Sequence, residues 1–352
     1  MRKIRIGNRF IGDGERPFII AEAGINHNGN VSLAKKLIDA AKKAEADAVK
    51  FQTFKAEDVV TKTAEKAGYQ KKTTEAEESQ FVMIKKLELE ERDFKELFDY
   101  AHRKGIMFLS SPFDKRSVDL LDKLGVPAFK IASGEITNLP LIKYIAQKGK
   151  PIILSTGMST MAEIKEALQV INDEGIRDIV LLHCITSYPA EVESSNLRAM
   201  RTLRRAFKLP VGLSDHTIGV TVPIAAVALG AAALEKHFTL DKNLPGPDHK
   251  ASLTPEELNQ MIMVVRQVEK AMGNGIKRPT EEEEEIKRVV RRSIIARVEI
   301  SKGTLITEEM LDIKRPGTGV EPKYMNKVIG AVARRRIEQG EPLTMNKLEL
   351  RR

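Results

Sequence analysis

The segment VGLSDHT, residues 211–217, begins as an apolar run that suits a buried strand and ends in three polar side chains, Ser214, Asp215 and His216. Seven other apolar runs also finish in polar residues, and segments with helical periodicity separate them. The eight runs are FIIAEAG (18–24), AVKFQTF (48–54), IMFLSSPF (106–113), AFKIASGE (128–135), PIILSTGM (151–158), IVLLHCITSYP (179–189), VGLSDHT (211–217) and LEKHFTL (234–240). The chain therefore alternates strand and helix eight times.

This alternation predicts an α/β protein built on a closed (β/α)8 TIM barrel, a fold that usually takes about 250 residues. An open doubly wound sheet is the competing architecture. It is disfavoured because no GxGxxG motif follows the first run, and because polar residues close all eight runs. In a parallel barrel the active site forms at the carboxyl ends of the strands. The polar ends of the runs are therefore the candidate functional residues.

One interval between runs, from Phe54 to Ile106, is too long for a single helical connection. It contains the polar stretch KTAEKAGYQKKTTEAEES, residues 62–79, followed by an amphipathic helical pattern over 89–105. The polar stretch has two readings of equal weight. It is either a lid over the barrel mouth or a solvated excursion without a role.

The expected domain order is a barrel over residues 1–272, a linker over 273–290 and a second domain over 291–352. Gly and Pro residues together with a run of five Glu mark the linker. Short strands and turns make the second domain β-rich. A domain of about sixty residues is only marginally stable alone. Docking against a barrel, which could belong to a partner chain, would stabilise it.

Composition narrows the classes of function. Of the 352 residues 42% are apolar, but the longest apolar stretch, 221–234, is too short to span a bilayer. The opening MRKIRIGNRFIGDGE lacks the apolar core of a signal peptide, and the single Cys184 fits a reducing compartment. We therefore expect a cytoplasmic protein with no membrane partner. The net charge of +9 suits an acidic small substrate, because basic residues are interleaved with acids instead of forming the stripe of a nucleic-acid-binding protein.

Two histidines at strand ends suggest a metal site. Side chains alternate along a strand, so His216 shares a face with Ser214, and His237 shares one with Glu235. Consecutive strands are neighbours in a barrel, so the two imidazoles are expected to face each other at the mouth. Such a pair suits a divalent ion, Mn²⁺ first and Mg²⁺ or Co²⁺ as alternatives, with water or substrate completing the shell. A lone histidine is more often structural, but the pairing favours the metal.

Two lysines within strands are the second signal. Lys50 and Lys130 are placed to point into the barrel, where an unpaired ammonium is costly to bury. Each must meet a carboxylate, an anionic ligand or the carbonyl carbon of a Schiff base. Turn chemistry explains each hydroxyl at the strand ends but not the lysines. The hydroxyl candidates are Ser110, Ser111, Ser133, Ser155, Thr156 and Ser214, and the acidic candidates are Glu22, Glu135, Glu235 and Asp248.

Ordered motifs give the chain a resemblance to a known family. AEAGINHNG, KFQTF, SSPF, KIASGE, LSTGM, GLSDHT and KHFTLDKNLPGPDHKAS occur in this order and closely resemble the sialic acid synthase (N-acetylneuraminate synthase) family. The C-terminal segments ISKGTLITEEML and KRPGTG look like the SAF, or antifreeze-like, domain that this family appends. The resemblance implies a TIM barrel with a small C-terminal SAF domain. It also implies an enzyme that joins phosphoenolpyruvate to an N-acetylated amino sugar.

The resemblance assigns roles to matching positions. His216 and His237 match the metal ligands. Lys50, Ser111, Lys130, Ser133, Ser155 and Ser214 match positions that hold phosphoenolpyruvate, and Glu22, Gln52, Tyr188 and Asp248 match residues near the sugar and the reacting centre. Of these, Glu22 and Asp248 are the candidate catalytic residues. Arg315 matches an arginine that enters the opposite subunit's mouth, which implies a domain-swapped homodimer.

The expected reaction is a metal-dependent condensation of phosphoenolpyruvate with N-acetylmannosamine. Thr186 stands where synthases for that sugar often carry Asn, so a 2,4-diacetamido-trideoxyhexose, as in legionaminic or pseudaminic acid synthesis, is the alternative acceptor. Two readings from other classes stay open. One is a Schiff-base aldolase that uses Lys130 or Lys50. The other is a non-enzymatic ice-binding role for the C-terminal domain, which its 14 basic and 8 acidic residues disfavour.

Overall fold

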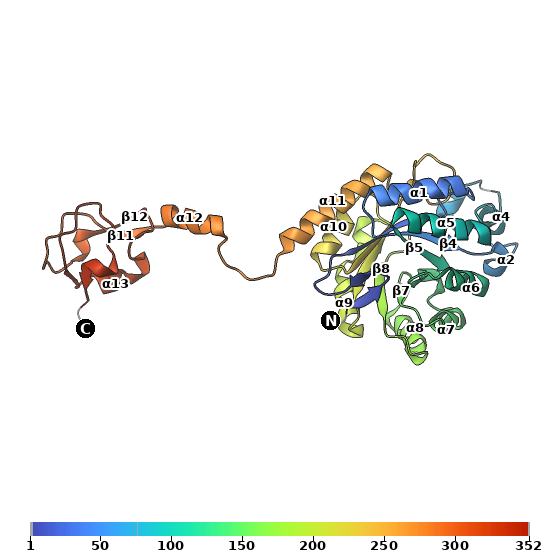
Figure 1. The fold of residues 1–352 in the computed structure, drawn as a ribbon, viewed down its shortest axis with the longest axis horizontal. Coiled ribbons are helices and arrows are strands. Elements are labelled where there is room, and N and C mark those ends of the chain that lie inside the picture. Colours follow the sequence, from blue (N-terminus) through green and yellow to red (C-terminus); the bar gives the residue numbers. More distant parts are fainter. Residues whose placement is uncertain (1–2, 76, 351–352) are drawn as a thin grey trace. The chain divides into compact units, whose positions relative to one another are not determined.

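A computed structural model describes residues 3–75 and 77–350 of the chain. The chain divides into two compact units, residues 1–273 and 274–352 (Figure 1). We describe each unit by itself.

The first unit is built around a parallel sheet of eight strands in the order β5-β4-β3-β10-β9-β8-β7-β6, within the described residues. The last strand in sequence pairs with the first, in register from Ala233 opposite Phe18 to His237 opposite Glu22, and β5 and β6 lie side by side. The sheet is therefore closed, and the predicted (β/α)8 barrel is confirmed. The strands are β3 (Phe18–Gly24), β4 (Ala48–Thr53), β5 (Met107–Pro112), β6 (Phe129–Ile131), β7 (Ile152–Ser155), β8 (Ile179–Cys184), β9 (Val211–Asp215) and β10 (Ala233–His237).

Helices follow the strands, and their amphipathic faces cover the barrel (Figure 1). They are α1 (Val31–Lys43), α5 (Glu91–Lys104), α6 (Lys115–Leu124), α7 (Leu139–Ala146), α8 (Met161–Asp173), α9 (Arg198–Phe207), α10 (Thr221–Ala228) and α11 (Pro255–Met272). Capping side chains determine where several of these helices begin. In α8, for example, the Thr160 side chain accepts from the Glu163 backbone and Glu163 accepts from the Thr160 backbone, which forms a capping box.

An N-terminal hairpin closes the barrel at the end where the strands begin. It consists of β1 (Ile4–Ile6) and β2 (Arg9–Ile11), which pair antiparallel. Its isoleucines are fully buried in one apolar cluster with side chains from the first half of several strands, among them Phe18, Leu109 and Ile153. This apolar plug leaves the polar strand ends at the opposite mouth.

The long connection between β4 and α5 is folded into short helices, α2 (Ala56–Val59), α3 (Gly68–Thr73) and α4 (Gln80–Lys85). Ile84 of α4 packs against a small apolar cluster of Ile25, Phe54 and Leu87. The connection is thereby fastened to the barrel by its own apolar residues.

The second unit contains two short α-helices and small antiparallel ladders in its described residues. It comprises α12 (Glu281–Val290), β11 (Ser293–Ala296), β12 (Leu311–Lys314), α13 (Met325–Val328), β13 (Val332–Ala333) and β14 (Leu348–Glu349). β11 pairs with β12 and β13 with β14, around a core that includes Ile294, Ile306 and Leu343. Within the described part of the chain, no helix has both the length and the apolar character to cross a bilayer.

The segment predicted to be a linker, 273–290, is helical over more than half its length. The run of five Glu belongs to α12, where Thr280 and Glu283 form a capping box. Acidic residues occupy the first turn, and Lys287 and Arg288 occupy the last, so both ends complement the helix dipole. Charge placement along the helix therefore explains why an acidic run, interpreted as a linker signal, forms a helix.

Candidate active site

Side chains at the carboxyl ends of the barrel strands line a pocket of about 370 Å³. Every barrel residue to which the family resemblance assigns a role lies in its wall: Glu22, Lys50, Gln52, Ser111, Lys130, Ser133, Ser155, Tyr188, Ser214, His216, His237 and Asp248. Arg315 is the exception. It follows β12 in the second unit and is exposed. Of the other strand-end candidates, Glu235 also lines the pocket, whereas Ser110 and Thr156 do not.

Strand register brings these side chains together. Glu22 is paired with Lys50 across β3 and β4, and Ser214 with Glu235 across β9 and β10. Because side chains alternate along a strand, the next residue of β9 and of β10 points to the other face of the sheet. Asp215 and Lys236 lie outside the pocket lining and form a buried ion pair with each other. On β9 and β10, therefore, Ser214 and Glu235 line the pocket, whereas their neighbours Asp215 and Lys236 are buried in the barrel wall.

Two lysines and two carboxylates form a buried cluster in the pocket. Lys50 Nζ lies 2.7 Å from Glu22 Oε2 and 3.8 Å from Glu235 Oε2. Lys130 Nζ lies 3.4 Å from Glu235 Oε1, which also accepts a hydrogen bond of 3.0 Å from Ser214 Oγ. Lys50 Nζ in addition donates to Ser111 Oγ at 3.2 Å. Glu235 thus bridges both lysines.

The electrostatics of this cluster differ between its two acids. Burial raises the pKa of Glu22 to about 7, against the opposing effect of Lys50 and with a further increase from Glu235. Burial alone would also raise the pKa of Glu235, but Lys130 and Lys50 outweigh it and the pKa is lowered. At neutral pH Glu235 is therefore a carboxylate, and Glu22 titrates between its two forms. Burial lowers the pKa of Lys130 despite the attraction of Glu235, so an anionic ligand beside this lysine would favour its charged form.

The two predicted metal ligands face each other next to an aromatic ring. The His216 and His237 ring centroids are 5.3 Å apart, and the ring of Tyr188 lies 4.1 Å from that of His216. His216 Nδ1 donates to the Ile185 carbonyl at 2.7 Å, so in the neutral ring the lone pair lies on Nε2. Asp248 Oδ2 is 3.9 Å from His237 Nδ1.

The two imidazoles are the protein ligands that this part of the pocket could offer to a divalent ion. Burial, and then the charge of His216, lowers the pKa of His237 well below its usual value, so its ring is neutral and able to act as a ligand. Its buried Nδ1 has no hydrogen-bond partner among the residues described. Over those same residues, no group of three or more His, Cys, Asp or Glu is placed to hold a metal ion. Most of the coordination shell would therefore come from water and substrate.

Other histidines have structural partners. His249 lies between Thr239 Oγ1 and Asn28 Oδ1, at 2.6 and 3.1 Å. His27 Nδ1 accepts from the Gly29 backbone at 3.0 Å, and His183 Nε2 lies 2.8 Å from the Ser195 carbonyl oxygen. These three rings do not line the pocket. Glu135, named among the acidic candidates, also lies outside the pocket lining and accepts from Asn138.

The pocket also contains residues that sequence reasoning had not assigned to it. Tyr69, Gln70 and Met83 come from the connection between β4 and α5, and Cys184 comes from the end of β8. The polar connection therefore contributes to the wall of the pocket, which favours the lid reading over the solvated excursion. No repeat, spacing or strand-end position marked Tyr69, because it lies on the short helix α3 in a segment without periodicity.

Comparison with known proteins shows the family of the chain. The NeuB family model matches residues 37–277, and the SAF domain model matches residues 291–349. The N,N'-diacetyllegionaminic acid synthase of Campylobacter jejuni is 51% identical over 329 residues, covering 93% of this chain and 98% of that protein. The enzyme of the same name from Legionella pneumophila is 47% identical over 336 residues, covering 94% of each chain.

The chain is also similar to a synthase of known structure. The N-acetylneuraminic acid (sialic acid) synthetase of Leptospira borgpetersenii, in complex with citrate, is 34% identical with a TM-score of 0.72, covering 81% of this chain and 95% of that one. A closed barrel with its charged pocket, followed by a SAF domain, defines a sialic-acid-type synthase. The chain belongs to the NeuB family, and it is an enzyme.

Proposed function

We propose that this enzyme condenses phosphoenolpyruvate with a 2,4-diacetamido-2,4,6-trideoxyhexose to give a legionaminic-type acid and phosphate. The observation that supports the reaction is the buried cluster of Lys50, Lys130, Glu22 and Glu235 in the same pocket as the facing histidines. The lysine cluster suits an anionic three-carbon substrate, and the histidine pair suits a polar aldehyde. The reaction needs both in one pocket.

In the proposed complex the lysines and strand-end hydroxyls hold phosphoenolpyruvate. Lys50 and Lys130 exchange part of their pairing with Glu22 and Glu235 for the carboxylate and phosphate of the ligand. Ser155 Oγ is buried without a hydrogen-bond partner among the described residues, so it is free to donate to the ligand. Ser111, Ser133 and Ser214 line the same pocket and supply further hydroxyl donors.

His216 and His237 would hold a divalent ion, for which we propose Mn²⁺. When bound, such an ion acts as a Lewis acid towards the sugar aldehyde. The protein's own contribution is orientation. The Ile185 carbonyl fixes the ring of His216, and Tyr188 packs against it. Asp248 lies beside His237, where its carboxyl can contact the sugar.

The chemistry then balances as follows. C3 of the enol attacks the aldehyde carbon, a C–C bond forms, and the aldehyde oxygen gains a proton. Positive charge develops at C2, where water adds and loses a proton. Glu22, with a pKa near 7, is suited both to stabilise that charge as a carboxylate and to accept the proton. The C2–O bond to phosphate breaks, and inorganic phosphate leaves.

The names of the relatives support this choice of acceptor. Two that are named as diacetyllegionaminic acid synthases are 51% and 47% identical to this chain, whereas the sialic acid synthetase of known structure is 34% identical. Thr186, in place of the Asn expected for N-acetylmannosamine, lines the pocket. N-acetylmannosamine, the acceptor expected from the motifs, is the second candidate. The relative that is 34% identical is named for N-acetylneuraminic acid, the product that this acceptor would give.

We also propose a homodimer in which the SAF domain of one chain serves the pocket of the other. Arg315 is the predicted contact with the acyl group of the sugar. It is exposed beside β12, and the barrel pocket offers no arginine among its lining residues in the described part of the chain. An arginine from a partner would supply the missing planar donor for an amide or acyl oxygen.

Phosphate release from phosphoenolpyruvate tests the function. Purified enzyme with Mn²⁺ is given the diacetamido sugar or N-acetylmannosamine, each with and without a chelator. A kcat/KM at least about tenfold higher for the diacetamido sugar is expected. Preference for N-acetylmannosamine would make the enzyme an N-acetylneuraminate synthase. Borohydride trapping of pyruvate on the protein, with no chelator effect, would favour the Schiff-base aldolase instead.

A further inference from the structure

The connection between β4 and α5, residues 55–75 and 77–90, contributes a large part of the pocket wall, and we call it the roof segment. Its lining residues are Val59, Val60, Tyr69, Gln70, Gln80, Met83 and Ile84. Four of them are apolar, one is aromatic and the two polar ones are uncharged. The opposite wall, with its lysines and carboxylates, is strongly charged. The pocket therefore has a charged side and a largely apolar side.

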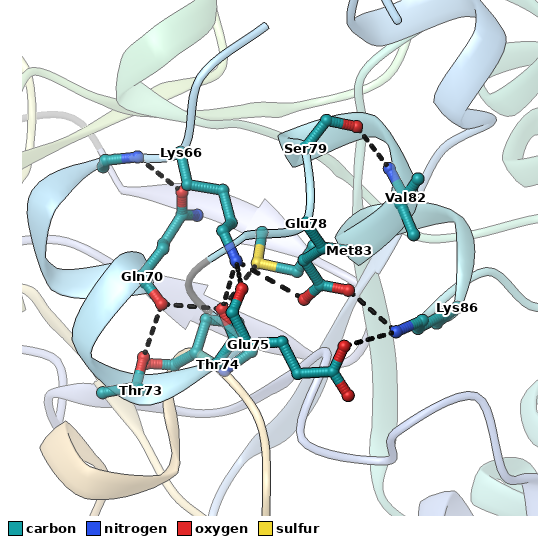
Figure 2. A network of polar contacts seen from close by, with 12 residues as sticks. Lys66, Gln70, Thr73, Thr74, Glu75, Glu78, Ser79, Val82, Met83 and Lys86 are labelled. Carbon is teal, nitrogen blue, oxygen red and sulfur yellow. Dashed lines mark hydrogen bonds and ion pairs between the residues drawn. The ribbon is translucent and has the colours of Figure 1, made fainter. Parts of the chain in front are cut away.

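A buried lysine holds the roof segment in shape, as Figure 2 shows. The side chain of Lys66 is fully buried, and its Nζ donates to Thr74 Oγ1 at 2.9 Å and to the Glu75 carbonyl. Its carboxylate partner is Glu78, at 3.5 Å, which also pairs with Lys86 at 2.8 Å (Figure 2). Burying an ammonium group is costly unless such partners surround it. The loop is therefore fixed around Lys66.

The fixed loop carries α3, and with it Tyr69, onto the acceptor end of the pocket. The ring of Tyr69 stacks on that of Tyr188, with centroids 5.1 Å apart and planes 29° apart. Tyr188 in turn lies against His216 at 4.1 Å. Thr73 Oγ1 donates to the Pro247 carbonyl at 3.3 Å, which ties the same helix to the loop that carries Asp248. Burial and the nearby charge of Asp248 both raise the pKa of Tyr69, so its hydroxyl stays protonated.

The position of this stack determines what it can recognise. Tyr69 is one aromatic ring away from the histidine that faces the aldehyde in the proposed complex. Aromatic faces and the aliphatic side chains of Val59, Met83 and Ile84 bind methyl groups and sugar C–H faces, and they offer no partner for an extra hydroxyl. An acceptor whose hydroxyls are replaced by acetamido and methyl groups fits such a wall better than a fully hydroxylated sugar.

We propose that Tyr69, positioned by Lys66, is a specificity-determining residue that selects acceptors with apolar substituents at the roofed end of the pocket. This inference rests on the proposed function for its choice of acceptor. It adds that the roof segment acts on the sugar and leaves phosphoenolpyruvate recognition unchanged. Lys66 is then a positioning residue, and it acts only through Tyr69.

The test compares KM for each substrate in Tyr69→Ala, Tyr69→Phe and Lys66→Met with wild type. Loss of one aromatic contact corresponds to about tenfold in affinity. We expect KM for the diacetamido sugar to rise about tenfold in Tyr69→Ala, and its preference over N-acetylmannosamine to fall by about the same factor. KM for phosphoenolpyruvate is expected to change less than about twofold, and Tyr69→Phe to resemble wild type. Lys66→Met should reproduce the effect of Tyr69→Ala.

Matched controls separate this role from general damage. Lys86→Met removes the half-exposed lysine that shares Glu78, and Tyr144→Ala removes a tyrosine bonded to Asp119 away from the pocket. Both should keep wild-type KM values. An unchanged sugar KM in Tyr69→Ala, or an equal rise for phosphoenolpyruvate, overturns the inference while the proposed function stands. A wild-type enzyme that is silent with both sugars overturns both. If Lys66→Met fails to fold, Tyr69→Ala and Tyr69→Phe still test whether Tyr69 selects the acceptor.

Discussion

The ammonium of Lys50 lies 2.7 Å from Oε2 of Glu22, and both side chains are at least 97% withdrawn from solvent. The pairing orients both groups without a ligand in the pocket, and Lys50 opposes the rise that burial causes in the pKa of Glu22. In the proposed complex the anionic substrate competes with Glu22 for Lys50, so binding of phosphoenolpyruvate would release Glu22 from this pair. This coupling leads to the first prediction.

Lys50→Met is expected to lower kcat/KM for phosphoenolpyruvate by at least about a hundredfold. Truncating one partner of a buried charge pair formed on binding costs about 2–5 kcal/mol, because the other charge, here that of the bound anion, is left unpaired. Steady-state phosphate release measures the effect. Lys143→Met is the control, since its ammonium pairs with Glu174 at the surface. A Lys50→Met enzyme within tenfold of wild type would contradict the assigned role.

The pKa of Glu22, raised by burial to about 7, predicts an acidic limb in the pH profile. The carboxylate is the form required, so kcat/KM should fall as pH drops below about 7, approaching tenfold per pH unit. Glu22→Gln should lower the plateau and abolish this limb. Asp248→Asn should keep it, because the pKa of Asp248 is raised only to about 6. An unchanged limb near pH 7 in Glu22→Gln would show that another group titrates.

Manganese binding tests the histidine pair independently of turnover. Titration calorimetry at neutral pH is expected to give one Mn²⁺ per chain, with at least about tenfold weaker binding in His216→Ala and in His237→Ala, because each removes a ligand. His183→Ala is the control, since its ring bonds to Ser195 outside this pocket. Equal affinity in all four proteins would place the ion elsewhere.

The ion pair of Asp215 and Lys236 predicts a change in stability. Both side chains are buried outside the pocket lining, and Lys236 also donates to the Thr217 carbonyl. Asp215→Asn leaves the buried ammonium of Lys236 without its carboxylate partner, so the free energy of unfolding of the barrel should fall by about 3–5 kcal/mol. The double variant Asp215→Leu, Lys236→Met should recover most of that loss in urea unfolding. A double variant less stable than Asp215→Asn would rule out charge isolation as the cause.

Arg315→Ala tests the proposed exchange of SAF domains. It should raise KM for the sugar at least about tenfold, the size of one lost charged hydrogen bond, and leave KM for phosphoenolpyruvate nearly unchanged. Mixing Arg315→Ala chains with Lys50→Met chains should restore activity, because a mixed dimer has one intact site. Absence of complementation would indicate that each chain serves its own pocket, and an unaltered sugar KM would exclude the arginine from the site.

Strand periodicity was sufficient to predict most of the pocket. Parity along β9 and β10 separates Ser214 and His216 from Asp215, and the structure places them on opposite faces for the same steric reason. Runs of apolar residues with polar ends were likewise enough for the closed barrel.

Other features depend on tertiary contacts that no local pattern records. Tyr69 lies in the pocket wall, stacked on Tyr188, in a loop built around the buried Lys66, and the hairpin of β1 and β2 is too short to stand out as strands. The helix α12 was missed for a different reason. Its capping box, Thr280 with Glu283, was present in the sequence, but the acidic run was interpreted as a linker.

The central claim, that this pocket joins phosphoenolpyruvate to an amino sugar with loss of phosphate, is tested most directly with phosphoenolpyruvate labelled with ¹⁸O at the bridging oxygen. Mass spectrometry would follow the label while phosphate and the nine-carbon acid are quantified together. Equal amounts of both products are expected, formed only when the sugar is present, with all of the bridging label in phosphate. Phosphate formed without the sugar, or label retained in the organic product, would contradict the claim.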